Sequence, residues 1–494
     1  MPTHPLPSNP NMDRLKATAK DLRNLVRAGA EGAIETVREH HPRSGALTSG
    51  SPEAITFKLA DAQLTLARHH GFASWPKLVR CVEEMRPLSR SPHQRLGVGT
   101  RPDGDELVRL ACMNYGDDSP RRPAAALELW RSNPTLAASS VFAAAAAGDS
   151  TAVTRFVSDD RDAVHRSGGP FDWPPLLYVT YSRLITGDRA HDFVETARVL
   201  LRNGADPNSG FLWDGLLPPF TAITGAVGRG EQGSGPHVDQ LTLLHLLLEA
   251  GADPNDGQAI YNSGIGNAQP RDDTDWLEVL YSYGFGSAVD GPWYRRFGDR
   301  LAEPGALAAE LLHDAARRGF VDRTRLLLGR GTDPNRPGDH AVFGQRAPYQ
   351  DAVERGYPEV ASLLLAAGAR PVDIGPVEQI IGRCLGGAAV SPAEAAAARE
   401  QTPDLVRMAC ELAKPGETIS RLVELGWSPN AKNRTTALHE AAVHGTLDIV
   451  QLLISLGADP SIIDDSFNAT PAGWAEHFGR ADISTYLDGL SRGR

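Results

Sequence analysis

The sequence predicts an all-α protein, a solenoid of stacked helix-turn-helix repeats with irregular insertions, preceded by a small helical N-terminal domain. A turn sequence, "GADPN" in its clearest form, recurs along the chain, as at residues 204–208 and 251–255. Apolar residues with helical spacing precede each copy of this turn. The chain has 494 residues, which is too long for one compact core unless the chain is a repeat array.

Composition and periodicity divide the chain into five segments. Residues 1–11 are polar and proline-rich, so we expect them to be disordered. Residues 12–87 have helical periodicity and form the predicted N-terminal domain, and residues 88–104 lack periodicity and form a predicted linker. Beyond the linker we expect degenerate repeats with insertions over residues 105–300. More regular repeats and a C-terminal cap follow over residues 301–494.

Within the N-terminal domain, one helix is predicted to begin after Ser51. Serine followed by proline is typical of an N-cap and a first helical turn. Ile55, Leu59 and other apolar residues then recur on one side, so we expect this helix to bury them and to end at Gly71.

The clearest repeat is "NRTTALHEAAVHGTLDIVQLLISLGADPS" at residues 433–461. Thr436 can cap a short first helix, and small alanines on its inner side let neighbouring helices approach closely. A second helix follows and ends at Gly457. Neither helix could bury its apolar face alone, so copies of the unit must stack.

This unit resembles the ankyrin repeat. "TALHEAA" matches the family's T-P-L-H-x-A-A helix opening, except that Ala437 replaces proline. In an earlier copy His313 takes the histidine position and Glu310 replaces the threonine. The resemblance implies that His439 makes hydrogen bonds between repeats and that the concave face binds proteins. It is strong over residues 306–371 and 417–490 and moderate over residues 130–255.

Several observations bear on provenance and compartment. The arginine-rich and alanine-rich composition is typical of a GC-rich bacterium, and the helical N-terminal segment resembles a leader that precedes bacterial ankyrin arrays. None of the four cysteines forms a C-x-x-C pair, and the start does not resemble a secretory signal, so we expect a cytoplasmic location. The net charge of −11 argues against nucleic acid as a partner. The apolar stretches are too short to span a membrane.

The aspartates of the recurring turns have a structural interpretation. In the copy that ends at Asn255, Gly251 is expected to take a left-handed conformation that ends a helix, and Pro254 prevents its continuation. Aspartate and asparagine stabilise turns through their side chains. Since each aspartate belongs to a different repeat, we expect them to lie in a row along one edge and to bind no ion. These aspartates are Asp206, Asp253, Asp333 and Asp459.

Other polar motifs give no prediction of a metal or a cofactor. His439 and His444 are five residues apart, about 140° around a helix, whereas a zinc-protease helix has its histidines on one face. The acidic run at residues 272–275 is expected to lie at the start of a short helix, where the helix dipole favours it. No nucleophile elbow, Walker loop or dinucleotide fingerprint occurs in the sequence.

Aromatic residues gather between Tyr261 and Phe297, where the repeat is most degraded. Aromatic and arginine side chains are the usual anchors of interfaces. The other interpretation, which we favour, is that the rings fill a local core where an insertion folds onto the array. The candidate partner-binding or ligand-binding residues are Trp213, Asp214, Tyr261, Trp276, Tyr281, Trp293, Tyr294, Arg295 and Arg296.

Two functional hypotheses follow. The favoured one is a non-catalytic, protein-binding repeat protein of the bacterial cytoplasm, whose partner lies on the concave face with the aromatic insertion contributing. The alternative is an enzyme with a pocket in the degenerate repeats around residues 213–296, acting on a small molecule in biosynthesis. An enclosed pocket with two close titratable groups would favour the enzyme, and an open groove would favour the binding protein.

Overall fold

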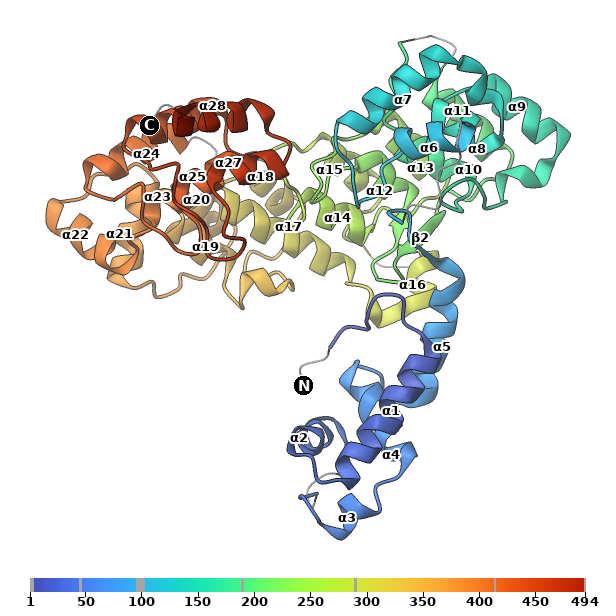
Figure 1. The fold of residues 1–494 in the computed structure, drawn as a ribbon, viewed down its shortest axis with the longest axis horizontal. Coiled ribbons are helices and arrows are strands. Elements are labelled where there is room, and N and C mark those ends of the chain that lie inside the picture. The colour runs from blue at the N-terminus through green and yellow to red at the C-terminus, as the bar shows by residue number, and fades with distance from the viewer. Residues whose placement is uncertain are drawn as a thin grey trace.

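The structure is a computed structural model that describes residues 4–43, 47–94, 103–187, 191–287, 291–412 and 415–492. Helices take up 58% of the chain and strands 3%, which confirms the predicted all-α class. The helices form a long array, and an N-terminal helical domain is attached to its side (Figure 1). In the part of the chain just given, no helix has both the length and the apolar composition that a bilayer crossing requires.

The N-terminal domain packs its helices around two small apolar clusters. Asn11 caps the first helix, because its side-chain oxygen accepts the backbone N–H of Asp13 at 2.8 Å. The preceding residues 4–11 belong to the segment predicted to be disordered, yet Leu6 is buried in one of the clusters. The helices are α1 (Met12–Arg27), α2 (Glu31–His40), α3 (Pro52–Ile55), α4 (Leu59–His69) and α5 (Trp75–Met85).

The prediction of a single helix after Ser51 is wrong, because the structure has two helices there, α3 and α4. Ile55 is 59% exposed and not buried as predicted. The chain leaves the helix after Ile55, so that the ring of Phe57 enters the apolar cluster that Ala54 and Ala62 also line. The new helix then starts with Asp61 accepting the backbone N–H of Lys58. Burial of the larger Phe57 ring therefore replaces burial of Ile55.

Beyond the N-terminal domain, the helices come in pairs that stack side by side. Along most of the array a first helix contacts the first helix of the next pair, as α8, α10 and α12 do, and second helices such as α9, α11 and α13 stack in the same way. The first helices are α6 (Gly104–Ala111), α8 (Val141–Ala147), α10 (Pro175–Tyr181), α12 (Ala222–Val227), α14 (Gly257–Ser263), α17 (Pro304–Arg318), α19 (Pro348–Glu354), α21 (Pro376–Leu385), α23 (Leu405–Ala409), α25 (Ala437–His444) and α27 (Pro471–His477). The second helices are α7 (Arg121–Ser132), α9 (Ser150–Asp159), α11 (Phe193–Arg202), α13 (Gln240–Glu249), α15 (Asp275–Ser282), α18 (Val321–Gly329), α20 (Pro358–Ala366), α22 (Pro392–Gln401), α24 (Pro415–Glu424), α26 (Leu447–Ser455) and α28 (Ala481–Arg492).

The recurring turns connect one repeat to the next. Gly251 has the predicted left-handed conformation, with a φ of 98°. The backbone N–H of Asn255 donates to the side chain of Asp253 at 2.9 Å. The side chain of Asn208 reaches the following turn, where it accepts the N–H of Asp253 and donates to the carbonyl of Gly251, both at 2.9 Å. The asparagine side chain therefore hydrogen-bonds the turn of the next repeat, and the aspartate side chain hydrogen-bonds the backbone of its own turn.

Two insertions depart from the repeat pattern and meet the N-terminal domain. A small sheet has the order β1-β2-β3, with β1 (Ser89–Arg90) parallel to β2 (Gly210–Trp213) and β2 antiparallel to β3 (Phe220–Thr221). Strand β1 lies in the predicted linker, of which residues 95–102 fall outside the described residues. The second insertion is α16 (Pro292–Phe297), followed by the short 3-10 helix η4 (Gly298–Arg300). In Figure 1, α16 lies where the N-terminal helices meet the array.

Candidate binding site

The rings of α16 join the N-terminal domain to the array. Phe297 is 5% exposed and belongs to the apolar cluster of the N-terminal domain, together with Leu212 of β2. Trp293 stacks on Phe297 with 6.1 Å between ring centroids, and its indole N–H donates to the carbonyl of Asn208 at 3.0 Å. These contacts support the core interpretation for the two rings. A role for Trp293 in partner binding stays a prediction.

Trp276 and Tyr281 lie in α15, the second helix of a repeat. Trp276 is 1% exposed, and the guanidinium of Arg229 lies 5.4 Å from its ring centroid. Tyr281 is half-buried beneath Arg330. Trp276 is therefore part of the core of the array. Of these two residues, a partner can reach only Tyr281 while α15 stays folded.

Trp213 and Asp214 lie at the end of β2. The Trp213 indole donates to the carbonyl of Asn114 at 3.0 Å, and its ring packs on His93 at 4.5 Å. Asp214 is buried and accepts the hydroxyl of Ser91. Through His93 and Ser91, these side chains fix the end of β2 to the segment that follows β1. Neither side chain lines the pocket that contains Tyr261, Trp293 and Tyr294.

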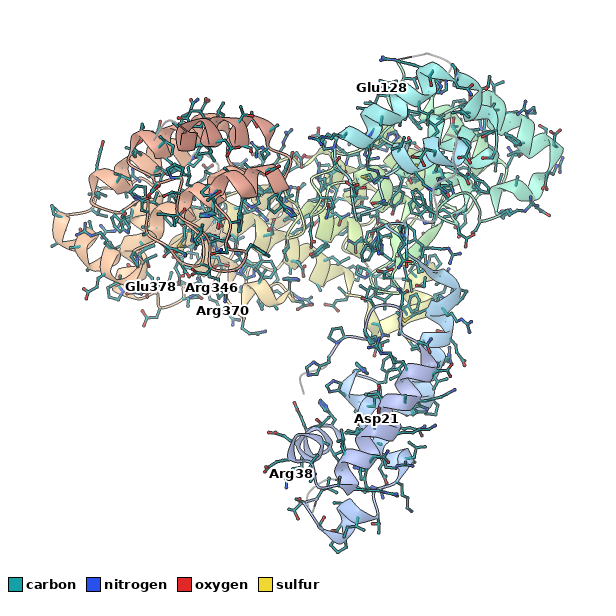
Figure 2. The ribbon with its side chains drawn as sticks, viewed as in Figure 1. Asp21, Arg38, Glu128, Arg346, Arg370 and Glu378 are labelled. Carbon is teal, nitrogen blue, oxygen red and sulfur yellow. The ribbon has the colours of Figure 1, made fainter. Side chains whose placement is uncertain are left out.

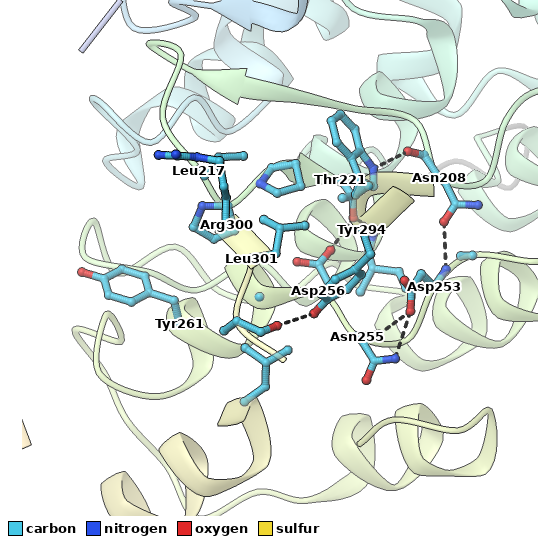
Figure 3. A pocket seen from close by; sticks show the side chains of 18 of the residues that line it. Asn208, Leu217, Thr221, Asp253, Asn255, Asp256, Tyr261, Tyr294, Arg300 and Leu301 are labelled. Atoms are coloured by element: carbon cyan, nitrogen blue, oxygen red, sulfur yellow. Dashed lines mark hydrogen bonds between the residues drawn. The ribbon is translucent and has the colours of Figure 1, made fainter. Parts of the chain in front are cut away.

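That pocket, which we call the junction pocket, has a volume of about 200 Å3. It lies among two of the recurring turns and the starts of α12, α14, α16 and α17 (Figure 3). The predicted residues Tyr261, Trp293 and Tyr294 line it, and Tyr294 donates its hydroxyl to the carbonyl of Ala302 at 2.7 Å. Arg295 and Arg296, the last two predicted residues, are exposed on the outside of α16.

Four charged residues of the junction pocket were not among the candidate site residues. They are Asp253, Asp256, Arg300 and Glu310. Two signals in the sequence pointed to them. The turn at residues 253–256 reads "DPND", whereas the other copies lack the final acid, and Glu310 stands where the repeat opening has threonine. Nothing in the local pattern indicated Arg300.

Asp256 is a structural carboxylate at the start of α14. It accepts the backbone N–H of Ala259 at 2.9 Å and the hydroxyl of Thr224 at 3.0 Å. The Thr221 hydroxyl also donates to it. Burial raises the pKa of Asp256, and these hydrogen bonds oppose that shift. Because both oxygens are already engaged, Asp256 offers little to a ligand.

Glu310, unlike Asp256, does not cap a helix. Helix α17 begins at Pro304, so Glu310 lies in the helix interior, and its half-buried side chain lines the junction pocket. Burial, together with the nearby carboxylates of Asp339 and Asp314, raises the pKa of Glu310 to about 7, although hydrogen bonds from the backbone of His340 and Asp339 oppose the shift. This carboxyl group therefore titrates near neutral pH.

The acidic run at residues 272–275 does more than the predicted dipole interaction. Asp272 accepts the backbone N–H groups of Asp322 and Arg323, both at 2.9 Å, at the start of α18. Asp273 pairs with Arg229 at 2.7 Å and lies 3.4 Å from the buried guanidinium of Arg323. The run thus connects two repeats. Among the described residues, no group of three or more histidine, cysteine, aspartate or glutamate side chains could hold a metal ion.

A groove lies on the more regular repeats. Two hollows of about 150 and 360 Å3 share four lining residues, Arg317, Val342, Arg355 and Met408. The larger hollow also contains Arg346 and Glu378, labelled in Figure 2. We call the combined depression the repeat groove. It crosses the ends of α17 and α19 and reaches α23.

Histidines join consecutive repeats next to this groove. His439 of α25 shares a hydrogen bond of 3.1 Å with the carbonyl of Ala469, just before α27, as the resemblance implied. His313 of α17 likewise shares a hydrogen bond of 2.9 Å with the side chain of Asp351 in α19. A family model of ankyrin repeats in three copies matches residues 396–488.

Residues 396–488 of this chain are ankyrin repeats. Most of the match, residues 417–488, falls where the predicted resemblance was strong, and stacked helix pairs continue on its N-terminal side in the structure. A search of curated proteins finds no match to this chain. Ankyrin repeats are protein-interaction modules, so the array indicates that this chain interacts with other proteins.

Proposed function

We propose that this ankyrin-repeat protein is a non-catalytic binding protein of the bacterial cytoplasm and that its protein partner lies in the repeat groove. The observation that carries the proposal is the continuity of the groove across four first helices, α17, α19, α21 and α23. Val342 on its rim is 46% exposed, and Arg317 and Arg355 flank it. Exposed apolar groups beside arginine are typical of interface anchors.

The aromatic insertion contributes less to this interface than its composition suggested. Trp293 and Phe297 are engaged within the chain, so α16 offers a partner mainly the exposed Arg295 and Arg296. Exposed charges change the rate of association and its dependence on salt more than they change affinity. We therefore assign α16 a secondary role, in which its two arginines attract an acidic partner.

The groove can be tested by capturing partners with cross-linking in cells of the source organism. A variant with Arg317→Ala, Arg355→Ala and Met408→Ala should lose partners that the wild-type protein retains. A matched control carries Arg325→Ala and Leu365→Ala, which change exposed residues of the second helices α18 and α20. If both variants retain the same partners as the wild type, the repeat groove is not the binding site.

A second candidate function is catalysis in the junction pocket. Glu310 supports it, because a carboxyl group with a pKa of about 7 suits general acid or base catalysis at neutral pH. Untargeted mass spectrometry of metabolite extracts, incubated with wild-type protein or with a Glu310→Gln variant, tests this function. A compound consumed only by the wild type would support it, and identical extracts would exclude catalysis that depends on Glu310.

A further inference from the structure

The junction pocket has apolar walls and an acidic end. Leu217 and Pro218 come from the insertion after β2, and Leu301 and Leu307 come from the segment that leads into α17. In Figure 3, Leu217 and Leu301 lie on one side and Asp253 on the other. The pocket's volume is about 200 Å3. The pocket is thus the size of one long side chain or a small molecule.

Two carboxylates that line the pocket have acceptor sites left for hydrogen bonds from a ligand. Asp253 uses one oxygen, Oδ1, to hold Asn255. Its other oxygen faces Gly291, where a Cβ atom would lie only 1.7 Å from it. Glycine at position 291 is therefore required for α16 to approach this acid. Glu310 is the second such group, since it lines the pocket and accepts hydrogen bonds from the backbone N–H groups of His340 and Asp339, while a carboxylate has about four acceptor sites.

The positive charge of Arg300 is directed elsewhere. Among the described residues, Arg300 is the basic side chain that lines the pocket. Its guanidinium lies 3.9 Å from the centre of the Phe72 ring in the N-terminal domain, which is a close cation–π contact. Asp253, Asp256 and Glu310 outnumber it, so the interior of the pocket is acidic overall.

We propose that the junction pocket binds an alkylammonium or alkylguanidinium cation, with the charge beside Glu310 and Asp253 and the aliphatic stem against Leu217, Pro218 and Leu307. Partial burial of the two carboxylates strengthens their attraction for a cation, because the local dielectric constant is lower than that of water. The rings of Tyr261 and Tyr294 add faces that attract cations. The proposal is independent of the repeat groove, which lies at the other end of α17 and shares no lining residue with the junction pocket.

The same cation could come from a free amine or from a lysine or arginine side chain of a protein. Isothermal titration calorimetry at pH 8 with n-butylamine, N-butylguanidine and a blocked tripeptide, acetyl-Gly-Lys-Gly-amide, distinguishes these sources. We expect saturable binding of one cation per chain. Tighter binding of the amine indicates a small-molecule ligand, and tighter binding of the peptide indicates a protein side chain.

Two variants and two uncharged or anionic probes make the test decisive. Glu310→Gln should weaken cation binding at least tenfold, while the control Glu303→Gln, which changes an exposed carboxyl group outside the lining, should leave it unchanged. Wild-type binding should also weaken by up to about tenfold from pH 8 to pH 6 as Glu310 gains a proton. Circular dichroism confirms that each variant is folded.

The proposal is overturned if the wild type binds no cation at pH 8, if 1-butanol or butyrate binds as tightly as butylamine, or if Glu310→Gln leaves the affinity unchanged. Butyrate binding in particular would show that Arg300 and not the acids determines the ligand. The groove variant with Arg317→Ala and Arg355→Ala should bind butylamine normally. Failure of the cation site and failure of the repeat groove are therefore separate results.

Discussion

Glu310 is a carboxyl group in a place where its helix offers no compensation for burial. An ankyrin opening has threonine at this position, the N-cap of the first helix, as Thr436 is for α25, where its hydroxyl hydrogen-bonds the ring of His439. Helix α17 begins earlier, at Pro304, and so has no use for a cap at position 310. The substitution thus converts a structural position into a half-buried acid that faces the junction pocket.

This environment predicts a stability effect that depends on pH. The pKa of Glu310 in the folded protein, about 7, lies above its ordinary value of 4.5. Its contribution to stability is therefore fully present below pH 4.5 and is lost as the pH rises through 7. We expect Glu310→Gln to raise the Tm by about 1–2 °C at pH 8 and to leave it unchanged at pH 4.5.

Differential scanning calorimetry of wild type, Glu310→Gln and Glu303→Gln at both pH values checks this expectation. The Glu303 control removes an exposed charge that pairs with Arg336, so its effect on the Tm should be small at both pH values. An equal shift for Glu310→Gln at pH 4.5 and pH 8 would show that its carboxyl group titrates normally.

At the scale of elements, the start of α18 depends on a residue from a different repeat. Asp272 caps α18 through two backbone N–H groups, whereas Asp275 lies in the first turn of its own helix, α15. Loss of a cap costs about 1–2 kcal/mol, and loss of a charge at a helix start costs about 0.3–1 kcal/mol. The two acids are neighbours in sequence but differ in function.

The matched pair Asp272→Ala and Asp275→Ala separates these two effects. We expect amide hydrogen exchange in α18 to become about five to thirty times faster in Asp272→Ala, which corresponds to about 1–2 kcal/mol of local stability. Exchange in α18 should be nearly unchanged in Asp275→Ala. Equal protection of α18 in both variants would mean that Asp272 is not its cap.

The elements that the sequence predicted well are those whose signals are local. The apolar spacing before Gly457 predicted a helix, and the structure has α26 there. The break between α3 and α4 was missed because burial of Phe57 depends on helices far away in the sequence. The charged residues that line the junction pocket were missed for the same reason, since Asp253, Arg300 and Glu310 come from separate turns and helices.

At the scale of the whole molecule, the N-terminal domain shares its core with the array. Phe297 of α16 and Leu212 of β2 complete the apolar cluster of α1, α4 and α5. Arg296 adds a hydrogen bond of 3.1 Å to the carbonyl of Glu84 at the end of α5. The degraded repeat around α16 therefore attaches the N-terminal domain, which explains the rings of Trp293 and Phe297, whereas Trp276 and Tyr281 pack within the array.

A Phe297→Ala variant should release the N-terminal domain while the array stays folded. Removing a buried phenylalanine costs about 3–5 kcal/mol, and here the loss falls on the contact between the domain and the array. We expect a larger radius of gyration by small-angle X-ray scattering and unchanged helix content by circular dichroism. Asp299→Ala, which changes an exposed residue of η4, is the control and should keep the wild-type radius. If Phe297→Ala keeps that radius too, β1, β2 and the chain before α1 hold the domain without α16, and the junction pocket would then keep its shape when the aromatic contact is lost.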